Sequence, residues 1–164
     1  MRQIGLESDH AKGHISYYFR NKQDLLFEIV DDLFERTIQG IRVWAAEPDL
    51  TDRERLHHVV YQNVLLTCNF HRESRVAHEN FRFLGADRRE LLRKSRAEYD
   101  VILGKVIDDF RAGRRAYSVN TEMLIRVLVA IINSPYEWYR PDGPLSAEQV
   151  AAILADRAVA AVEP

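Results

Sequence analysis

Residues 11–26, AKGHISYYFRNKQDLL, bring together the side chains of this sequence that are best suited to contacting a nucleic acid. Basic, histidine, serine and tyrosine side chains hydrogen-bond to phosphate oxygens and base edges. The stretch is long enough for a two-turn helix, and an amphipathic helix follows it. A helix-turn-helix module presents its recognition helix to the major groove in this order. The free N–H groups at 21–24, beside Lys22, would suit a backbone phosphate.

This stretch resembles the recognition segment of the TetR family of bacterial transcription regulators, which runs small-Lys-Gly-x-aliphatic-Tyr-x-x-Phe-x-x-Lys-x-x-Leu. Residues 11–25 keep every position of the motif except one, because serine stands in place of the usual tyrosine at position 16. The resemblance implies two sets of DNA contacts. Contacts with bases or sugars would come from Lys12, His14 and Tyr18. Contacts with phosphates would come from Ser16, Tyr17 and Lys22.

In the family, one helix and most of a second precede this segment, whereas this chain begins at Met1. We therefore interpret residues 1–21 as the remnant of a helix-turn-helix head and expect residues 22–164 to form a helical ligand-binding and dimerisation domain. Two functions stay open. The chain is either a DNA-binding repressor, with operator DNA as partner if its head is complete, or a headless dimeric ligand-binding or interaction protein that does not bind DNA by itself.

The composition indicates an ordinary globular protein. Of 164 residues, 46% are hydrophobic and 29% are charged, and the net charge of −2 argues against a protein coated in basic residues. The longest apolar run, residues 127–132, is too short to cross a bilayer, and no signal sequence is apparent, so we expect a cytoplasmic protein without a membrane partner. A single cysteine, Cys68, cannot form an internal disulfide, which suits a reducing compartment.

Apolar residues recur at helical spacing along the whole chain, and no segment alternates with a period of two. The pattern predicts an all-α fold with a TetR-like body. Capping residues predict helix starts after Asn21, Thr51 and Ser146, the last two with Glu or Gln three positions later as capping boxes. Further helices are predicted over 74–84, 87–112 and 120–139, the last with a kink at Pro135.

The segment MLIRVLVAII, residues 123–132, is apolar in nine of ten positions and must be covered on every side. Few other helices are available, so we predict a homodimer through a four-helix bundle of the last two helices from each chain. A central helix in a monomer is the alternative. The predicted interface consists of Ile131, Ile132, Trp138, Val150, Ile153, Leu154, Ala158 and Ala161.

The body of a TetR regulator holds a ligand pocket, so the resemblance implies a hydrophobic small-molecule effector. A fully packed core would use the same residues equally well. The candidate pocket residues are Val60, Val64, Cys68, Phe81, Tyr99, Ile102, Leu103, Phe110, Leu124 and Leu128.

The tail of the sequence suggests the effector's class. The phrase Trp138-Tyr139-Arg140-Pro141-x-Gly143 is similar to the tails of TetR-type regulators of fatty-acid and steroid catabolism that respond to acyl-CoA thioesters. The resemblance implies an acyl-CoA-like effector. The arginine-rich run DRRELLRKSR, residues 87–96, would attract its phosphates, or else it forms a solvated helix face paired with nearby carboxylates.

Enzymatic chemistry is not expected. The sequence lacks a phosphate-cradling glycine loop, a nucleophile elbow and a His-Glu-x-x-His motif. The histidines at 57, 58, 71 and 78, with Glu79, are candidates for a metal site, but the side chains of neighbours 57 and 58 diverge on a helix. We expect no metal and no cofactor.

Overall fold

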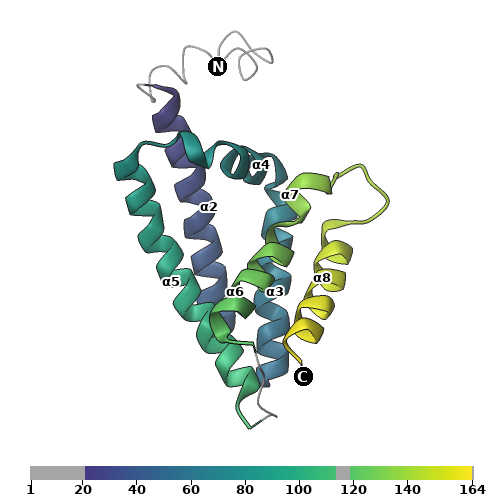
Figure 1. Cartoon of the computed structure of the whole chain (residues 1–164). Coiled ribbons are helices and arrows are strands. Elements are labelled where there is room, and N and C mark those ends of the chain that lie inside the picture. The colour runs from purple at the N-terminus through teal and green to yellow at the C-terminus, as the bar shows by residue number, and fades with distance from the viewer. Residues whose placement is uncertain (1–20, 114–118, 164) are drawn as a thin grey trace.

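The computed structural model describes residues 21–113 and 119–163, and these ranges contain helices and connecting turns only (Figure 1). The predicted all-α class is confirmed. The elements are α2 (Lys22–Ala45), α3 (Asp52–Asn69), α4 (His71–Asn80), the 3-10 turn η1 (Phe81–Phe83), α5 (Ala86–Arg111), α6 (Thr121–Asn133), α7 (Pro135–Trp138) and α8 (Ala147–Val162).

The longer helices α2, α3, α5, α6 and α8 run roughly along one axis (Figure 1). Helices α2 and α5 lie side by side on one flank and α3 packs against α8 on the other, while α6 contacts α3, α5 and α8. The short helices α4 and α7 lie across the end at which α2 begins, and α4 contacts both α2 and α7. Helix α3 therefore occupies the centre of the body.

The predicted helix starts are confirmed by hydrogen bonds at the caps. Asn21 Oδ1 accepts hydrogen bonds from the backbone N–H groups of Gln23 at 2.9 Å and Asp24 at 3.0 Å. Thr51 and Ser146 each form a complete capping box with the residue three positions later. These side chains satisfy backbone donors that would otherwise be left unpaired at the helix ends.

Two predicted helices differ in their limits. Helix α4 begins at His71, three residues earlier than expected. The segment predicted as one kinked helix over 120–139 forms two helices, because Pro135 has no N–H and begins a new turn, α7. The N–H of Ser134, just before the proline, bonds to the carbonyls of Ala130 and Ile131 and closes α6.

The main core lies where α3, α5, α6 and α8 meet, and its largest buried members include Leu56, Leu103 and Phe110. Helix α8 contributes mainly small residues, of which Ala151 and Ala155 are fully buried. Because alanine adds little bulk, α8 can approach α3 closely. A second, smaller cluster of Leu26, Val30, Leu84 and Leu92 joins α2 to the start of α5.

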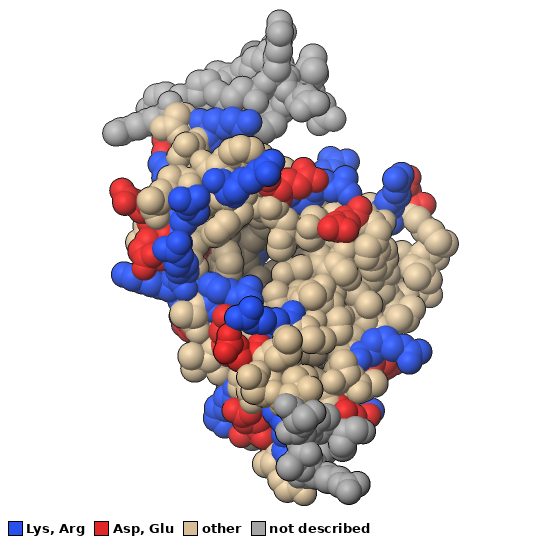
Figure 2. All heavy atoms as spheres, viewed as in Figure 1, with Lys and Arg blue, Asp and Glu red and all other residues tan. Residues whose placement is uncertain are grey.

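One face of α6 is covered by the chain itself and the opposite face is not. Leu124 and Leu128 are buried, whereas Met123 is 53% exposed and Val127 is 37% exposed. Ile153 of α8 is exposed as well. Figure 2 shows a broad uncharged area over this part of the surface. In the described ranges, every helix is too short or too polar to cross a membrane.

We expect Leu103→Ala to lower the free energy of unfolding by about 2–5 kcal/mol, because the Leu103 side chain is fully buried and its removal leaves a cavity. The matched control is Val101→Ala on the same helix, where the side chain is 73% exposed and the change should stay within about 0.5 kcal/mol. Urea denaturation at fixed protein concentration measures both. Equal losses in the two variants would contradict the described core.

Candidate functional site

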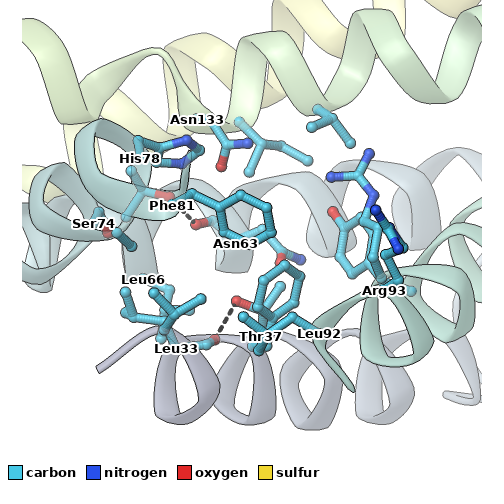
Figure 3. A pocket seen from close by; sticks show the side chains of 18 residues that line it. Leu33, Thr37, Asn63, Leu66, Ser74, His78, Phe81, Leu92, Arg93 and Asn133 are labelled. Carbon is cyan, nitrogen blue, oxygen red and sulfur yellow. Dashed lines mark hydrogen bonds between the residues drawn. The ribbon is translucent and has the colours of Figure 1, made fainter. Parts of the chain in front are cut away.

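A cavity of about 530 Å³ lies between α2, α3, α4, α5 and α6 (Figure 3). Figure 2 shows the corresponding face hollowed near its middle, with Lys and Arg side chains gathered along the α5 flank. The lining residues come from every one of these helices and from η1. They are Val30, Leu33, Phe34, Thr37, Asn63, Leu66, Thr67, Ser74, Ala77, His78, Phe81, Leu92, Arg93, Arg96, Tyr99, Val129, Ile132 and Asn133.

The walls of the cavity are largely apolar. Phe34 of α2, Phe81 of η1 and Leu92 of α5 belong to or pack against the smaller hydrophobic cluster, and Ile132 of α6 belongs to the main core. The cavity thus lies between the two clusters. A space of this size with apolar walls and a few polar groups is typical of a small-molecule site.

The most deeply buried polar side chain in the wall is Asn63, which is 3% exposed. Its Nδ2 donates a hydrogen bond of 2.7 Å to the carbonyl of Val59, one turn earlier in α3. Its Oδ1 is buried and has no hydrogen-bond partner within the described residues. One turn further along, the hydroxyl of Thr67 donates to the backbone carbonyl of Asn63 at 3.1 Å. Unpaired buried acceptors are rare in folded proteins.

Two arginines of α5 line the cavity and remain partly exposed. Arg96 Nε donates to Asp100 Oδ1 at 2.8 Å, and Arg93 pairs with Glu90. A guanidinium group has five N–H donors, so one carboxylate contact leaves others able to reach an anion. Both arginines are therefore suited to holding a carboxylate or phosphate at the rim.

The imidazole of His78 lies flat against the ring of Tyr136, with the ring centroids 4.3 Å apart and the planes within 8°. Burial lowers the pKa of His78, and the positive charge of Arg96 lowers it further, against the opposing effect of a hydrogen bond with Asn133. The imidazole is therefore neutral at neutral pH. Burial also raises the pKa of Tyr99, so its phenol stays protonated.

The structure divides the predicted pocket residues between the cavity and the core. Phe81 and Tyr99 line the cavity. Ile102 packs partly buried against the main core. The remaining predicted residues are buried members of the main core. They are Val60, Val64, Cys68, Leu103, Phe110, Leu124 and Leu128. Apolar periodicity identifies buried faces, but it does not distinguish a packed face from one that borders a cavity.

Sequence reasoning missed the polar residues of the cavity wall. In α3, Asn63 and Thr67 interrupt an otherwise apolar buried face, and this interruption was the available signal. Polar residues at buried helical positions indicate either an internal hydrogen bond or a ligand. Burial also raises the pKa of the Cys68 thiol to about 11, which makes Cys68 an unreactive core residue.

The predicted dimer residues also separate. Val150 and Ala158 of α8 and Ile132 of α6 are buried in the chain's own core. Ile131 and Leu154 pack partly buried against that core. The outward-facing members of the set are Trp138, Ile153 and Ala161.

Of the predicted DNA-contacting residues, Lys22 is exposed at the first position of α2. It lies with Asn21, Gln23 and Arg88 around a shallow depression. Arg88 forms an ion pair with Asp24 and so joins α5 to the start of α2. Lys12, His14, Ser16, Tyr17 and Tyr18 lie outside the described residues.

In the basic run of α5, Arg88, Arg93 and Arg96 pair with carboxylates, and the last two also line the cavity. The histidines considered for a metal site are dispersed. Over 21–113 and 119–163, no three His, Cys, Asp or Glu side chains come together to hold a metal ion. Instead, His57 Nε2 of α3 lies 3.3 Å from Asp156 Oδ1 of α8, a contact that links the two helices.

Known structures share this fold. A regulatory protein of the TetR family from Rhodococcus RHA1 superposes with a TM-score of 0.83 at 17% identity, covering 99% of this chain and 85% of that one. The ketosteroid transcriptional regulator KstR2 of Mycobacterium tuberculosis superposes with a TM-score of 0.79 at 17% identity, covering 95% of this chain and 82% of KstR2. AibR, solved in complex with isovaleryl coenzyme A and operator DNA, superposes with a TM-score of 0.72 at 20% identity, covering 89% of this chain and 79% of AibR.

No curated protein matches the sequence. Residues 49–162, more than half of the chain, match the family described as Tetracyclin repressor-like, C-terminal domain. The matched range runs from just before α3 to the end of α8 and includes most of the cavity wall. Members of this family are transcriptional regulators rather than enzymes. The chain therefore belongs to the TetR family of transcriptional regulators.

Proposed function

We propose that this protein is a cytoplasmic, ligand-responsive repressor of the TetR type that controls genes of fatty-acid or steroid catabolism. Its effector is a hydrophobic molecule with an anionic group, such as an acyl-CoA thioester. The observation that carries this proposal is the cavity itself, which combines apolar walls with two arginines at one side. Apolar burial would supply most of the affinity, and the arginines would orient the anion.

Two structural neighbours support this ligand class. AibR was solved with isovaleryl coenzyme A and operator DNA, and KstR2 is named as a ketosteroid regulator. The similarity of the 138–143 segment to regulators that respond to acyl-CoA points the same way.

Helix α2 would transmit ligand binding to DNA. Val30, Leu33, Phe34 and Thr37 of α2 line the cavity, and the same helix begins directly after residues 1–21, which we assign to the DNA-binding head. A ligand that favours one position of α2 would shift the population of head positions. Residues 22–164 would then be the ligand-binding and dimerisation domain.

We further propose a homodimer in which α6 and α8 of two copies form a four-helix bundle. The uncovered residues Met123 and Val127 of α6, with Ile153 of α8, supply the apolar surface that a second copy would bury. A two-fold interface places the same surface on both partners.

If this interface exists, Val127→Glu should weaken dimerisation by about tenfold or more, because an unpaired charge would be buried in it. The matched control is Val101→Glu, which places the same charge on the exposed outer side of α5 and should leave the dimer intact. Sedimentation velocity over a concentration series measures both. A wild-type protein that is a monomer at all concentrations would contradict the proposal.

Dodecanoyl-CoA at about a hundred times its Kd should add about 2.7 kcal/mol of stability and raise the Tm by several degrees. Arg96→Gln should reduce this shift, because it removes a cation at the cavity. Arg126→Gln is the control, since Arg126 also pairs with a carboxylate one turn away but does not line the cavity. Differential scanning fluorimetry measures the shifts, and the absence of any shift with wild-type protein would argue against this effector class.

DNA binding distinguishes the repressor from the headless alternative. Binding to duplex DNA should weaken steeply with salt, and Lys22→Ala should lower the slope of log K against log salt by about 1, because one phosphate contact is lost. Lys105→Ala, on an exposed lysine towards the other end of α5, should leave the slope unchanged. Fluorescence anisotropy over a salt series gives the slopes. No binding at low salt, with ligand binding retained, would favour the headless ligand-binding protein.

A further inference from the structure

The side-chain amide of Asn63 has a defined orientation in the wall of the cavity. Its Nδ2 is held by the carbonyl of Val59 at 2.7 Å, so Oδ1 is the end left without a partner. Asn63 is buried and lines the cavity (Figure 3). A ligand that fills the cavity excludes water from this oxygen. It must then supply a hydrogen-bond donor or leave the oxygen unpaired at a cost in affinity.

The hydroxyl groups of Thr37 and Thr67 do not supply that donor. Thr37 Oγ1 donates to the carbonyl of Leu33 at 2.7 Å, and Thr67 Oγ1 donates to the backbone carbonyl of Asn63 at 3.1 Å. A hydroxyl has only one proton to donate, so these two groups offer acceptor lone pairs to the cavity. Thr37 and Thr67 therefore add acceptors, and no donor for Asn63, to this part of the wall.

The opposite chemistry is found at the partly exposed side. Arg93 and Arg96 carry donors and positive charge, and Figure 3 shows Arg93 on the far side of Asn63 from His78 and Asn133. The site thus combines an acceptor in its buried wall with cations at its rim. A fully apolar acid would satisfy the cations alone.

We propose that Asn63 is the specificity-determining residue of this cavity and accepts a hydrogen bond from an O–H or N–H group within the apolar part of the ligand. The ligand is therefore an amphipathic anion with an embedded donor, either a hydroxyl on an acyl chain or an amide in a thioester arm. This inference rests on the proposed function, in which the cavity holds an anionic hydrophobic effector.

The first experiment compares ligands on the wild-type protein. Isothermal titration calorimetry is done with dodecanoic acid and with a set of hydroxydodecanoic acids that differ in the hydroxyl position. At least one hydroxy isomer should bind about tenfold or more tightly than dodecanoic acid. Equal or weaker binding by every isomer would overturn the hydroxyl form of the proposal. This comparison needs no variant.

The second experiment removes the acceptor. Asn63→Leu keeps the number and branching of the side-chain heavy atoms but removes the acceptor. The preference for the hydroxy acid should disappear, with dodecanoic acid bound as well as before or more tightly. Asn63→Ala is the second variant in case the leucine protein does not fold. The matched control is Asn69→Leu, the same substitution at an exposed position of α3 outside the cavity wall, which should keep the preference. Retention of the preference in Asn63→Leu, or its equal loss in Asn69→Leu, would overturn the assignment to Asn63.

Dodecanoyl-CoA distinguishes the two sources of the donor. If an amide N–H of the thioester arm donates to Asn63, then Asn63→Leu should weaken the binding of dodecanoyl-CoA by about tenfold but leave the binding of dodecanoic acid unchanged. If the acids and thioesters bind, but Asn63→Leu changes the affinity of none of the ligands that carry a donor, the inference is overturned. If none of these acids or thioesters binds the wild-type protein, the proposed function itself fails.

Discussion

The close packing of α3 against the alanine-rich face of α8 is the constraint on which the rest of the body depends. The small side chains of Ala151, Ala155 and Ala158 are fully buried there. One face of the central helix α3 is therefore closely packed and shielded from solvent. The other face of α3 carries Asn63 and Thr67 towards the cavity. An amide that would lose its hydration cannot be packed among apolar side chains without cost. The same helix thus anchors the core and forms the polar wall of the site.

The chemistry of the cavity follows from how far each polar group is withdrawn from water. The buried acceptor of Asn63 has no partner in the described residues, while the charged groups of Arg93 and Arg96 stay in contact with solvent and with carboxylates. His78, stacked on Tyr136, is neutral at neutral pH and adds no third cation. Charge is kept where water can solvate it, and directional hydrogen bonding is left to the buried wall.

Helix α6 links the two surfaces that the proposals concern. Val129 and Ile132 of α6 line the cavity, while Met123 and Val127 face outward from the same helix. In the proposed dimer, a second copy would therefore pack against a helix whose other side borders the ligand. Helix α2 also lines the cavity, and it follows residues 1–21 in the sequence. Both helices give a ligand direct contact with the elements that would have to move.

The sequence by itself determined the all-α class and the capped starts of α2, α3 and α8, because capping bonds and apolar periodicity act within a single segment. At Pro135 it predicted a kink, where the structure has a break between two helices. It also identified which faces are buried, but it assigned residues such as Leu103 to a pocket when they fill the core. Only the tertiary structure shows that Asn63 and Arg96 line the same cavity. Whether two buried faces close completely or leave a cavity depends on the packing of helices that are distant in the sequence, and no local pattern records that fit.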